Sequence, residues 1–177
     1  MRLFVGIDLP WELRGELAAL RVALPGARWV AEENLHLTLR FIGEVPPNQA
    51  EDIDVALHGL RGRKFPLTLT GLGTHCRKGR ETALWAGVER SPALEHVQAK
   101  VETALQRAGQ PPERRRFLPH VTLARLDALA ETRLAGYMQA HNLFRAKMIE
   151  IDHLTLFSSL LCKEAAVYTA EESYPLG

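Results

Sequence analysis

The segments His36-Leu37-Thr38-Leu39 and His120-Val121-Thr122-Leu123 each place a histidine two residues before a threonine. In an extended strand neighbouring side chains point to opposite faces, so each histidine shares a face with its threonine. The leucines and the valine then point the other way, into a core. If the two strands lie side by side, two imidazoles and two hydroxyls converge on one place. Such a set of groups is suited to acid/base chemistry on a phosphate.

Two histidines could cleave a cyclic phosphodiester without a metal. One group must take a proton from the attacking water, and another must give a proton to the leaving oxygen on the far side of the phosphorus. Imidazole, with an unperturbed pKa of about 6.5, can do either near neutral pH. The hydroxyls of Thr38 and Thr122 could donate hydrogen bonds to non-bridging oxygens. The pattern therefore predicts an in-line displacement driven by positioning and proton transfer.

Strict alternation also predicts where the side chains just after each motif point. It puts Arg40 on the face of the first histidine, where a cation could contact a phosphate or an RNA backbone. It puts Phe41 with the leucines, which favours core packing over stacking on a base. It puts Arg125 on the face opposite the second threonine. Arg125 can then reach a phosphate only where the strand ends, twists or bulges.

The composition is that of a globular protein. The chain has 177 residues, of which 46% are hydrophobic and 24% charged, and a formal net charge of +1. This charge argues against electrostatic binding to long duplex nucleic acid but leaves room for a local basic pocket. Cys76 and Cys162 lack ligand spacing, which predicts reduced, partly buried thiols and no zinc site. The apolar run at residues 2–7 is far shorter than the ~20 residues of a membrane span, so we expect a cytoplasmic protein without a membrane partner.

Strand and helix patterns alternate along the chain. The pattern predicts strands at 3–9, 29–30, 35–43, 66–76, 82–89, from 118, at 148–157 and at 165–169, and helices at 10–24, 46–60, 92–108 and 128–140. The strand-helix order occurs twice, and the two histidine motifs stand at matching points of it, which suggests an internal duplication. Hairpin-spaced strands mixed with helices favour an α+β fold with antiparallel sheets. We expect residues 1–177 to form one domain of two pseudo-symmetric lobes around a central groove.

The motifs and their flanks resemble a known family. The segments Asn34–Gly43 and Pro119–Arg125, with the opening strand Met1–Asp8, are similar to those of the two-histidine (2H) phosphoesterase superfamily. Within it, they resemble bacterial and archaeal RNA 2′,3′-cyclic phosphodiesterases, historically called 2′-5′ RNA ligases. The resemblance spans nearly the whole chain. It implies a bilobal α+β fold and hydrolysis of a terminal ribose 2′,3′-cyclic phosphate to a 2′-phosphomonoester, with no metal and no cofactor.

The resemblance also implies roles for individual residues. By motif position, His36 would donate a proton to the leaving 3′ oxygen and His120 would accept the proton of the water. Thr38 and Thr122 would bind the phosphate, and Arg125 resembles a phosphate-contacting arginine of the family. The near symmetry of the pair leaves the order of acid and base open. Further candidate contacts to RNA are Arg40 and Phe41. The implied partners are RNA ends or nucleotides that carry a cyclic phosphate, and a monomer with no protein partner is expected.

Three other interpretations remain open. The first is a 2′-5′ RNA ligase, which runs the same chemistry backward, and the second is a noncatalytic module that binds RNA ends or nucleotides. The third is a metallohydrolase. Neither a dinucleotide fingerprint nor a GxxxxGK[ST] motif occurs, so no ATP site is predicted. The basic segments 114–116 and 77–80 are either guides for RNA or solvated surface. Surface or core positions are expected for the remaining histidines, which are His58, His75, His96, His141 and His153.

Overall fold

The computed structural model describes the backbone of all 177 residues and every side chain except those of Leu129, Glu131 and Thr132. Its strands are β1 (Arg2–Asp8), β2 (Ala27–Trp29), β3 (His36–Glu44), β4 (Phe65–Leu67), β5 (Leu69–Arg77), β6 (Arg80–Val88), β7 (His120–Leu126), β8 (Ile149–Ile151), β9 (His153–Leu161) and β10 (Ala166–Pro175). Its helices are α1 (Trp11–Ala18), α2 (Pro47–His58), α3 (Pro92–Arg107) and α4 (Glu131–His141), with 3₁₀ turns η1 (Glu32–Asn34) and η2 (Ala128–Ala130).

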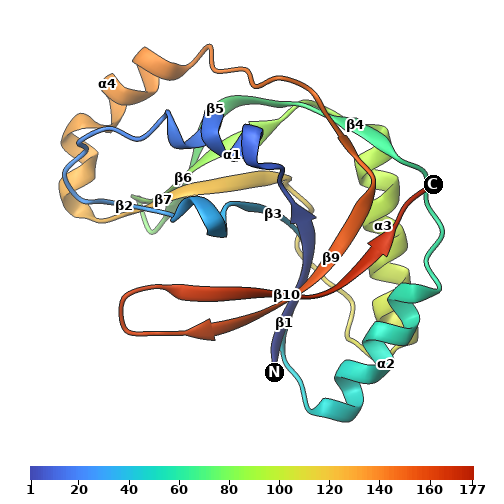
Figure 1. Cartoon of the computed structure of the whole chain (residues 1–177). Helices are drawn as coiled ribbons and strands as arrows, with labels where there is room; N and C mark the ends of the chain where they lie inside the picture. The colour runs from blue at the N-terminus through green and yellow to red at the C-terminus, as the bar shows by residue number, and fades with distance from the viewer.

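The main sheet has two halves that meet at the two motif strands. Its order is β10-β9-β1-β3-β7-β6-β5, with β2 beside β7, and a separate small sheet pairs β4 with β8 (Figure 1). Every strand pairing described is antiparallel, which confirms the α+β class. The central neighbours β3 and β7 share one residue pair, Leu37 with Val121. Buried residues of both halves belong to one hydrophobic cluster, while the symmetry of the two halves stays a prediction.

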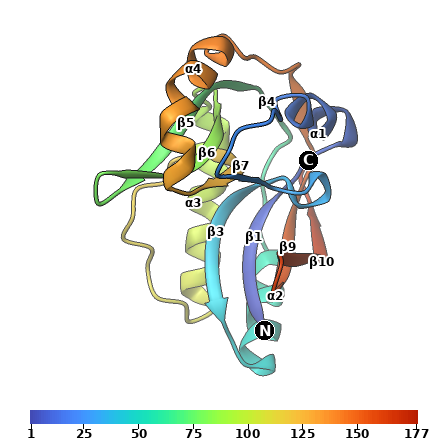
Figure 2. The same ribbon diagram turned by 90° about the vertical axis from the view of Figure 1, so that its left-hand side faces the viewer.

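The helices contact different strands of the sheet. Helices α2 and α3 contact each other, and α3 contacts β3 while α2 contacts β10. Helix α4 contacts β5, and the hydroxyl of Tyr137 in α4 donates to the carbonyl of Leu20, just after α1, at 2.9 Å. Figure 2 shows α2 and α3 behind β1 and β3, with α4 beside β5 and β6. Helices α2 and α3 thus pack against β10 and β3, and α4 packs against β5.

Local signals explain where the helices start and stop. The Ser91 hydroxyl accepts the amide N–H of Leu94 at 3.1 Å and Pro92 takes the first helical position, so α3 begins where the sequence predicts. Helix α1 ends at Ala18, well short of the predicted residue 24. Beyond its end, the carbonyls of Leu20 and Val22 accept bonds from Tyr137 and from the Trp29 indole. Side chains from other elements therefore supply the donors that a longer helix would have supplied to these carbonyls, and the helix can end.

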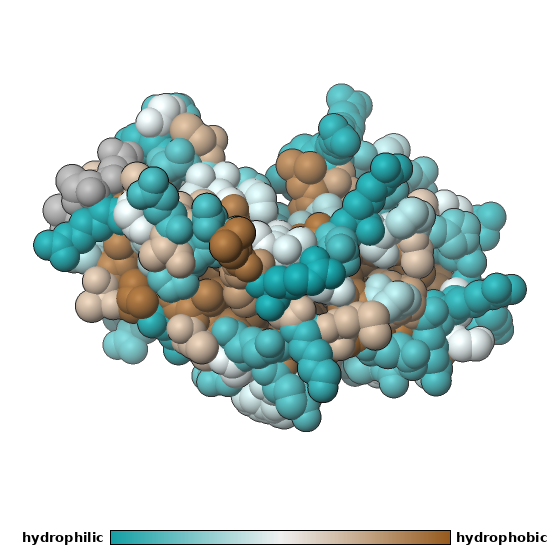
Figure 3. All heavy atoms as spheres, turned by 90° about the horizontal axis from the view of Figure 1, so that it is seen from above, coloured by the Kyte–Doolittle hydropathy of each residue, from teal (hydrophilic) through white to brown (hydrophobic). Residues whose placement is uncertain are grey.

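The face seen from above is mixed in character. Hydrophilic side chains project along its edges, and apolar side chains lie between them (Figure 3). Within the described part of the chain, no helix combines the length and apolar character that a bilayer crossing needs. Cys76 and Cys162 are free thiols, but both are exposed, so the prediction of partial burial is wrong.

Candidate active site

The pairing of Leu37 with Val121 brings the two motifs together. Both side chains are fully buried, at 0% exposure, while the histidines and threonines beside them are half-buried on the other face. In an antiparallel pair this register sets His36 next to the threonine of β7, and Thr38 next to His120. The two histidines are then diagonal neighbours, whose Cα atoms typically lie about 7–8 Å apart. Two imidazoles and two hydroxyls therefore share one face at the joint of the sheet.

A β-bulge in β7 decides where Arg125 points. In the pairing with β6, Leu84 lies opposite Ala124 but Trp85 lies opposite Thr122, so Leu123 is an extra residue. An extra residue reverses the alternation of faces beyond it. Ala124 is accordingly buried, whereas Arg125 is exposed and close enough for its charge to act on His120. The structure thus supplies the bulge that Arg125 needs to share the face of Thr122.

The same irregularity occurs in β3 and overturns the predicted faces there. Val5 pairs with Arg40 but Gly6 pairs with Thr38, so Leu39 is the extra residue. Arg40 is therefore buried, at 7% exposure, and Phe41 is exposed, at 39%. The alternation that placed Arg40 beside His36 and Phe41 in the core was wrong for both residues. Leu39 and Leu123 hold the same place in their motifs, so the two copies share the bulge.

Arg40 is committed to structural contacts. Its Nε donates to Glu102 of α3 at 2.7 Å, and its terminal nitrogens donate to the carbonyls of Phe41 and Pro111. Burial alone would raise the pKa of Glu102, but bonds from Arg40, Gln106 and the Glu113 amide lower it, so the pair is ionised. The guanidinium joins β3 to α3 and to the loop before β7. Because the side chain is buried and held by these partners, we no longer expect Arg40 to contact RNA.

Phe41 presents an aromatic surface beside the motif. Its ring is nearly parallel to that of Phe4, with centroids 6.3 Å apart, and the Arg2 guanidinium lies 5.2 Å from its centroid. Phe4 in turn lies 4.8 Å from the ring of His36. The ring of Phe41 is thus exposed beside the row formed by Phe4 and His36, while its stacking on a base stays a prediction.

The ring of His36 is held in one orientation and tautomer. Its Nδ1 lies 2.7 Å from the carbonyl of Asn34, and because a carbonyl only accepts, Nδ1 carries hydrogen. In the neutral ring Nε2 is then free of hydrogen and accepts from the Thr38 hydroxyl at 3.0 Å. The Asn34 amide is fixed in turn by the carbonyl of Ala166 in β10, at 2.9 Å. Nε2 is thus the nitrogen available for proton transfer.

His120 repeats this arrangement. Its Nδ1 lies 2.6 Å from the carbonyl of Leu118, again two residues earlier. Pro119 between them favours an extended backbone at Leu118, which helps to direct that carbonyl. Nε2 of the neutral ring therefore carries the lone pair, as in His36.

Burial lowers the pKa of both histidines below the ordinary value of 6.5. For His36, burial is the largest effect, the Asn34 carbonyl raises the pKa, Arg14 and His120 lower it, and Asp8 raises it. For His120, burial again comes first, the Leu118 carbonyl raises the pKa, and His75 and Arg125 lower it. Both rings are neutral at pH 7 in the absence of an anion. A negatively charged ligand would raise both pKa values.

Several residues that the sequence analysis did not select line the site. Tyr168 of β10 meets the His36 ring edge-on at 5.0 Å, and Phe157 of β9 lies 6.0 Å from it. A cavity of about 140 Å³ beside His36 is lined by Asp8, Arg14, Glu33, Asn34, Leu35, Phe157, Tyr168 and Ala170. The residues from β9 and β10 come from the far end of the sequence. No local pattern marks them, because only the strand order brings them to β1 and β3.

His75 of β5 also belongs to this neighbourhood. Its Nε2 lies 3.4 Å from Nε2 of His120, and Trp85 of β6 lies 5.8 Å from both rings. The sequence did not indicate that His75 would lie beside a motif histidine, and its expected place as a surface or core residue stays a prediction. The only sign of this position in the sequence was that a histidine stands within a strand of the hairpin 69–88.

A third segment has the spacing of the two motifs but lacks their environment. His153-Leu154-Thr155-Leu156 opens β9, which is separated from β3 by β1. Thr155 is buried, at 3% exposure, and the His153 ring binds its neighbour Asp152 at 2.6 Å. The spacing of histidine and threonine alone does not identify a site. The distinguishing feature is the meeting of two such strands.

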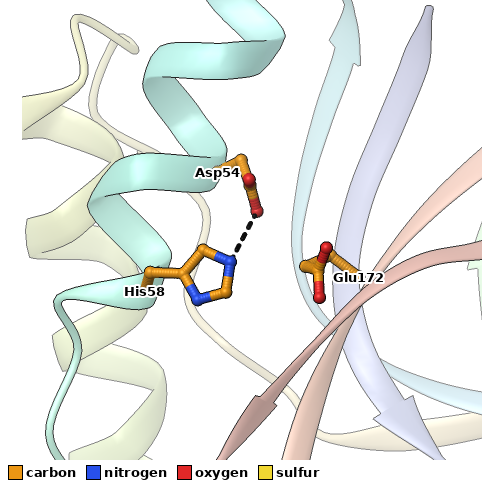
Figure 4. A group of neighbouring side chains, drawn as sticks. All are labelled: Asp54, His58 and Glu172. Atoms are coloured by element: carbon orange, nitrogen blue, oxygen red, sulfur yellow. Dashed lines mark ion pairs between the residues drawn. The ribbon is translucent and has the colours of Figure 1, made fainter.

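One group of side chains could hold a metal ion, outside the two motif strands. Asp54 and His58 of α2 and Glu172 of β10 place ligand atoms within 4.8 Å of one another (Figure 4). His58 is one helical turn from Asp54 and lies 3.4 Å from it, the pair marked in the figure. Asp54 also accepts the Tyr174 hydroxyl at 2.6 Å. The group is largely exposed, and part of its acceptor capacity is already used.

The basic segment before β7 lies on the surface. Arg114, Arg115 and Arg116 are all exposed, and Arg115 binds Glu113 at 3.3 Å. These side chains adjoin the strand of His120 in sequence. A role in guiding RNA stays a prediction.

Comparison with known proteins places the chain in a family. The family described as the 2′-5′ RNA ligase superfamily matches residues 9–160. An RNA 2′,3′-cyclic phosphodiesterase of Aeropyrum pernix is 34% identical over 160 residues, which cover 87% of this chain and 91% of that protein. One from Thermotoga maritima is 34% identical over 132 residues, or 71% of this chain and 70% of the relative.

Solved structures agree with the sequence comparison. The crystal structure of Escherichia coli LigT in complex with 3′-AMP superposes with a TM-score of 0.80 at 27% identity, over 99% of this chain and 97% of that one. A crystal structure described as a phosphoesterase gives a TM-score of 0.81 at 27% identity, with the same coverage. The antiparallel architecture described above is therefore shared along almost the whole length of these chains.

Proposed function

This chain belongs to the 2′-5′ RNA ligase superfamily, and we propose that it opens terminal RNA 2′,3′-cyclic phosphates to 2′-phosphomonoesters without a metal. The observation that carries the proposal is the convergence of His36 and His120 on one face of the joint between β3 and β7. Each ring is held at Nδ1 by a carbonyl, so that each offers Nε2 for proton transfer. The names of the relatives support the same reaction.

The reaction needs one protonated and one neutral histidine. Nε2 of neutral His120 takes a proton from water as the water oxygen bonds to phosphorus. The bond from phosphorus to the 3′ oxygen breaks, and protonated His36 gives its proton to that oxygen. This order is the one that the positions of the two motifs imply. Burial is the largest cause that lowers the pKa of each ring, so both His36 and His120 are close enough to neutrality to exchange a proton in the reaction.

Thr38, Thr122 and Arg125 are proposed to bind the phosphoryl oxygens. The two hydroxyls share the histidine face of their strands, and the bulge brings Arg125 to that face. A guanidinium there would stabilise the negative charge that shifts to the oxygens during displacement. Proton transfer and positioning then supply the catalysis without a metal. We expect the enzyme to act on RNA ends or nucleotides, in the cytoplasm and as a monomer.

Ligase activity is the alternative that the same site allows. A ribose 5′-hydroxyl in place of water would lose its proton to the same base, while the leaving 3′ oxygen gains one from the same acid, and a 2′-5′ linkage would form from the cyclic phosphate. Water is far more abundant than any 5′-hydroxyl, so hydrolysis is expected to dominate. A noncatalytic binding module would keep the pocket but show no turnover.

The test is the product formed from an oligonucleotide that ends in a 2′,3′-cyclic phosphate. We expect a 2′-phosphomonoester, at a rate that EDTA leaves unchanged. His36→Ala and His120→Ala should each lose about 10²–10⁴-fold in kcat. His96→Ala, at an exposed histidine of α3, is the matched control and should match the wild type.

Several outcomes would redirect the assignment. Equal turnover by His36→Ala and wild type would exclude the two-histidine mechanism. Activity that EDTA abolishes and added metal restores would favour the metallohydrolase. Joining to a 5′-hydroxyl fragment faster than hydrolysis would favour the ligase.

A further inference from the structure

A third imidazole meets the reactive nitrogen of His120. The rings of His75 and His120 are edge to face, with centroids 4.8 Å apart and an interplanar angle of 84°. Their Nε2 atoms are 3.4 Å apart. Because Nδ1 of His120 donates to Leu118, Nε2 of neutral His120 has only a lone pair. The contact is a hydrogen bond only if His75 carries hydrogen on Nε2 and donates it.

This hydrogen bond occupies the atom that the proposed reaction uses. A nitrogen whose lone pair already accepts from His75 cannot take a proton from water, so the contact must open when the substrate reacts. A separation of 3.4 Å leaves room for an oxygen atom within hydrogen-bond distance of both nitrogens, at about 2.8–3.0 Å from each. The atom that must bind His120 Nε2 in the proposed reaction is the oxygen of the attacking water. His75 is therefore within reach of the nucleophile.

The surroundings of His75 fix its position. The Trp85 ring lies beside both histidines and crosses the backbone at Gly73, where an added Cβ would come within 2.1 Å of the indole. Only glycine at position 73 permits this close approach. The Thr82 hydroxyl donates to the carbonyl of His75 at 3.3 Å. The buried indole N–H of Trp85 has no acceptor among the described residues, so one hydrogen-bond donor beside the site is unsatisfied.

We propose that His75 positions the attacking water. Its Nε2–H, which donates a hydrogen bond to His120 in the free protein, donates instead to the water oxygen when the substrate binds, and the water donates a hydrogen bond to Nε2 of His120. Bond formation to phosphorus then moves that hydrogen to His120, while His75 keeps its own proton throughout. The inference rests on the proposed function, because it assigns a contact to the water of that reaction.

Two substitutions at one position test the role. His75→Leu removes the donor, and His75→Gln keeps an N–H donor at a similar reach. We expect His75→Leu to lower kcat about 10- to 100-fold with KM within about twofold of the wild type, because positioning of the nucleophile is lost and phosphate binding is not. His75→Gln should recover most of kcat. His96→Leu on α3 is the matched control, with unchanged kcat.

The affinity for a nucleoside 2′-phosphate, measured by calorimetry, separates water positioning from phosphate binding. We expect His75→Leu to bind it as the wild type does. A wild-type kcat in His75→Leu, a loss confined to KM or to product affinity, or a His75→Gln variant as slow as His75→Leu would each overturn the inference. In these cases wild-type hydrolysis still stands. A wild-type protein that does not hydrolyse the cyclic phosphate would overturn the proposed function, and this inference with it.

Discussion

At the scale of the residue, each histidine depends on a carbonyl two positions before it. Asn34 lies in the 3₁₀ turn η1 before β3, and Leu118 precedes a proline before β7. The backbone that holds the carbonyl differs between the two histidines, but in both the carbonyl binds Nδ1. A substitution at Asn34 or Leu118 changes the side chain but keeps the backbone carbonyl. The local fold, not a particular side chain, therefore orients each histidine ring.

The pH dependence of the reaction follows from the lowered pKa of both histidines. The active form needs one protonated and one neutral ring, so kcat/KM, which reports the free enzyme, should follow a bell whose optimum lies below about pH 6.5. Above it the acid loses its proton, and below it the base gains one. The bound anion raises both pKa values, so the profile of kcat should lie at higher pH. Steady-state rates between pH 4.5 and 9 would show this, and a flat kcat/KM would contradict it.

Phe41 tests the aromatic surface beside His36. Phe41→Ala should raise KM for an oligonucleotide substrate about tenfold, because stacking of a base on an aromatic ring is worth about 1–3 kcal/mol. Its free energy of unfolding should change by less than about 1 kcal/mol, since the ring is exposed. Phe41→Trp keeps an aromatic face and should retain a low KM. Equal KM values for Phe41→Ala and wild type would remove this ring from substrate binding.

At the scale of the element, the bulges mark the limit of prediction from the sequence. Alternation correctly assigned the faces from His36 to Leu39 and from His120 to Leu123, because these positions precede the bulge. One extra residue then reversed the faces of Arg40 and Phe41. Neither extra residue is a glycine or a proline, and the one glycine at these bulges, Gly6, lies on the partner strand β1. The partners across the strands impose the irregularity, and a single sequence does not display them.

The buried ion pair of Arg40 in β3 should make a measurable contribution to the free energy of unfolding. Arg40→Ala should lower the free energy of unfolding by about 3–5 kcal/mol, because it leaves the Glu102 carboxylate without its buried partner. The kcat of the folded fraction should stay near that of wild type. Urea denaturation gives the first quantity, and Arg116→Ala, at an exposed arginine, is the control. A stable Arg40→Ala with a raised KM would instead return Arg40 to the list of RNA contacts.

Long-range elements explain the residues that the sequence did not reveal. Most helices and strands were predicted from their patterns, including α3 with its Ser91 cap. His75, Trp85, Phe157 and Tyr168 reach the site only through the order of the strands, with β5 and β6 beside β7 and β9 and β10 beside β1. That order depends on contacts between distant segments. The motif residues could therefore be predicted, whereas the walls around them could not.

At the scale of the whole molecule, the site lies where the two halves of the sheet are least connected. A single residue pair joins β3 to β7, whereas β1 and β3, and β6 and β7, share several pairs each. Histidine rings can be half-buried at such a joint and still meet a ligand from outside. The cost is a pair of titratable groups kept neutral by burial. The same two histidines therefore affect both the proposed reaction and the free energy of unfolding.

This coupling predicts how folding stability depends on pH. Because the pKa of His36 and of His120 is lower in the folded than in the unfolded chain, the unfolded chain binds more protons below about pH 6.5, and the free energy of unfolding must fall as the pH drops from there. The lowered pKa of Glu102 acts in a separate window, where stability is lost only below about pH 4.5. Urea denaturation at pH 7.5, 6.5 and 5.5 would measure the first window. The double variant His36→Gln/His120→Gln should flatten it and leave the acid window intact, while a slope equal to that of wild type would mean that other groups carry the linkage.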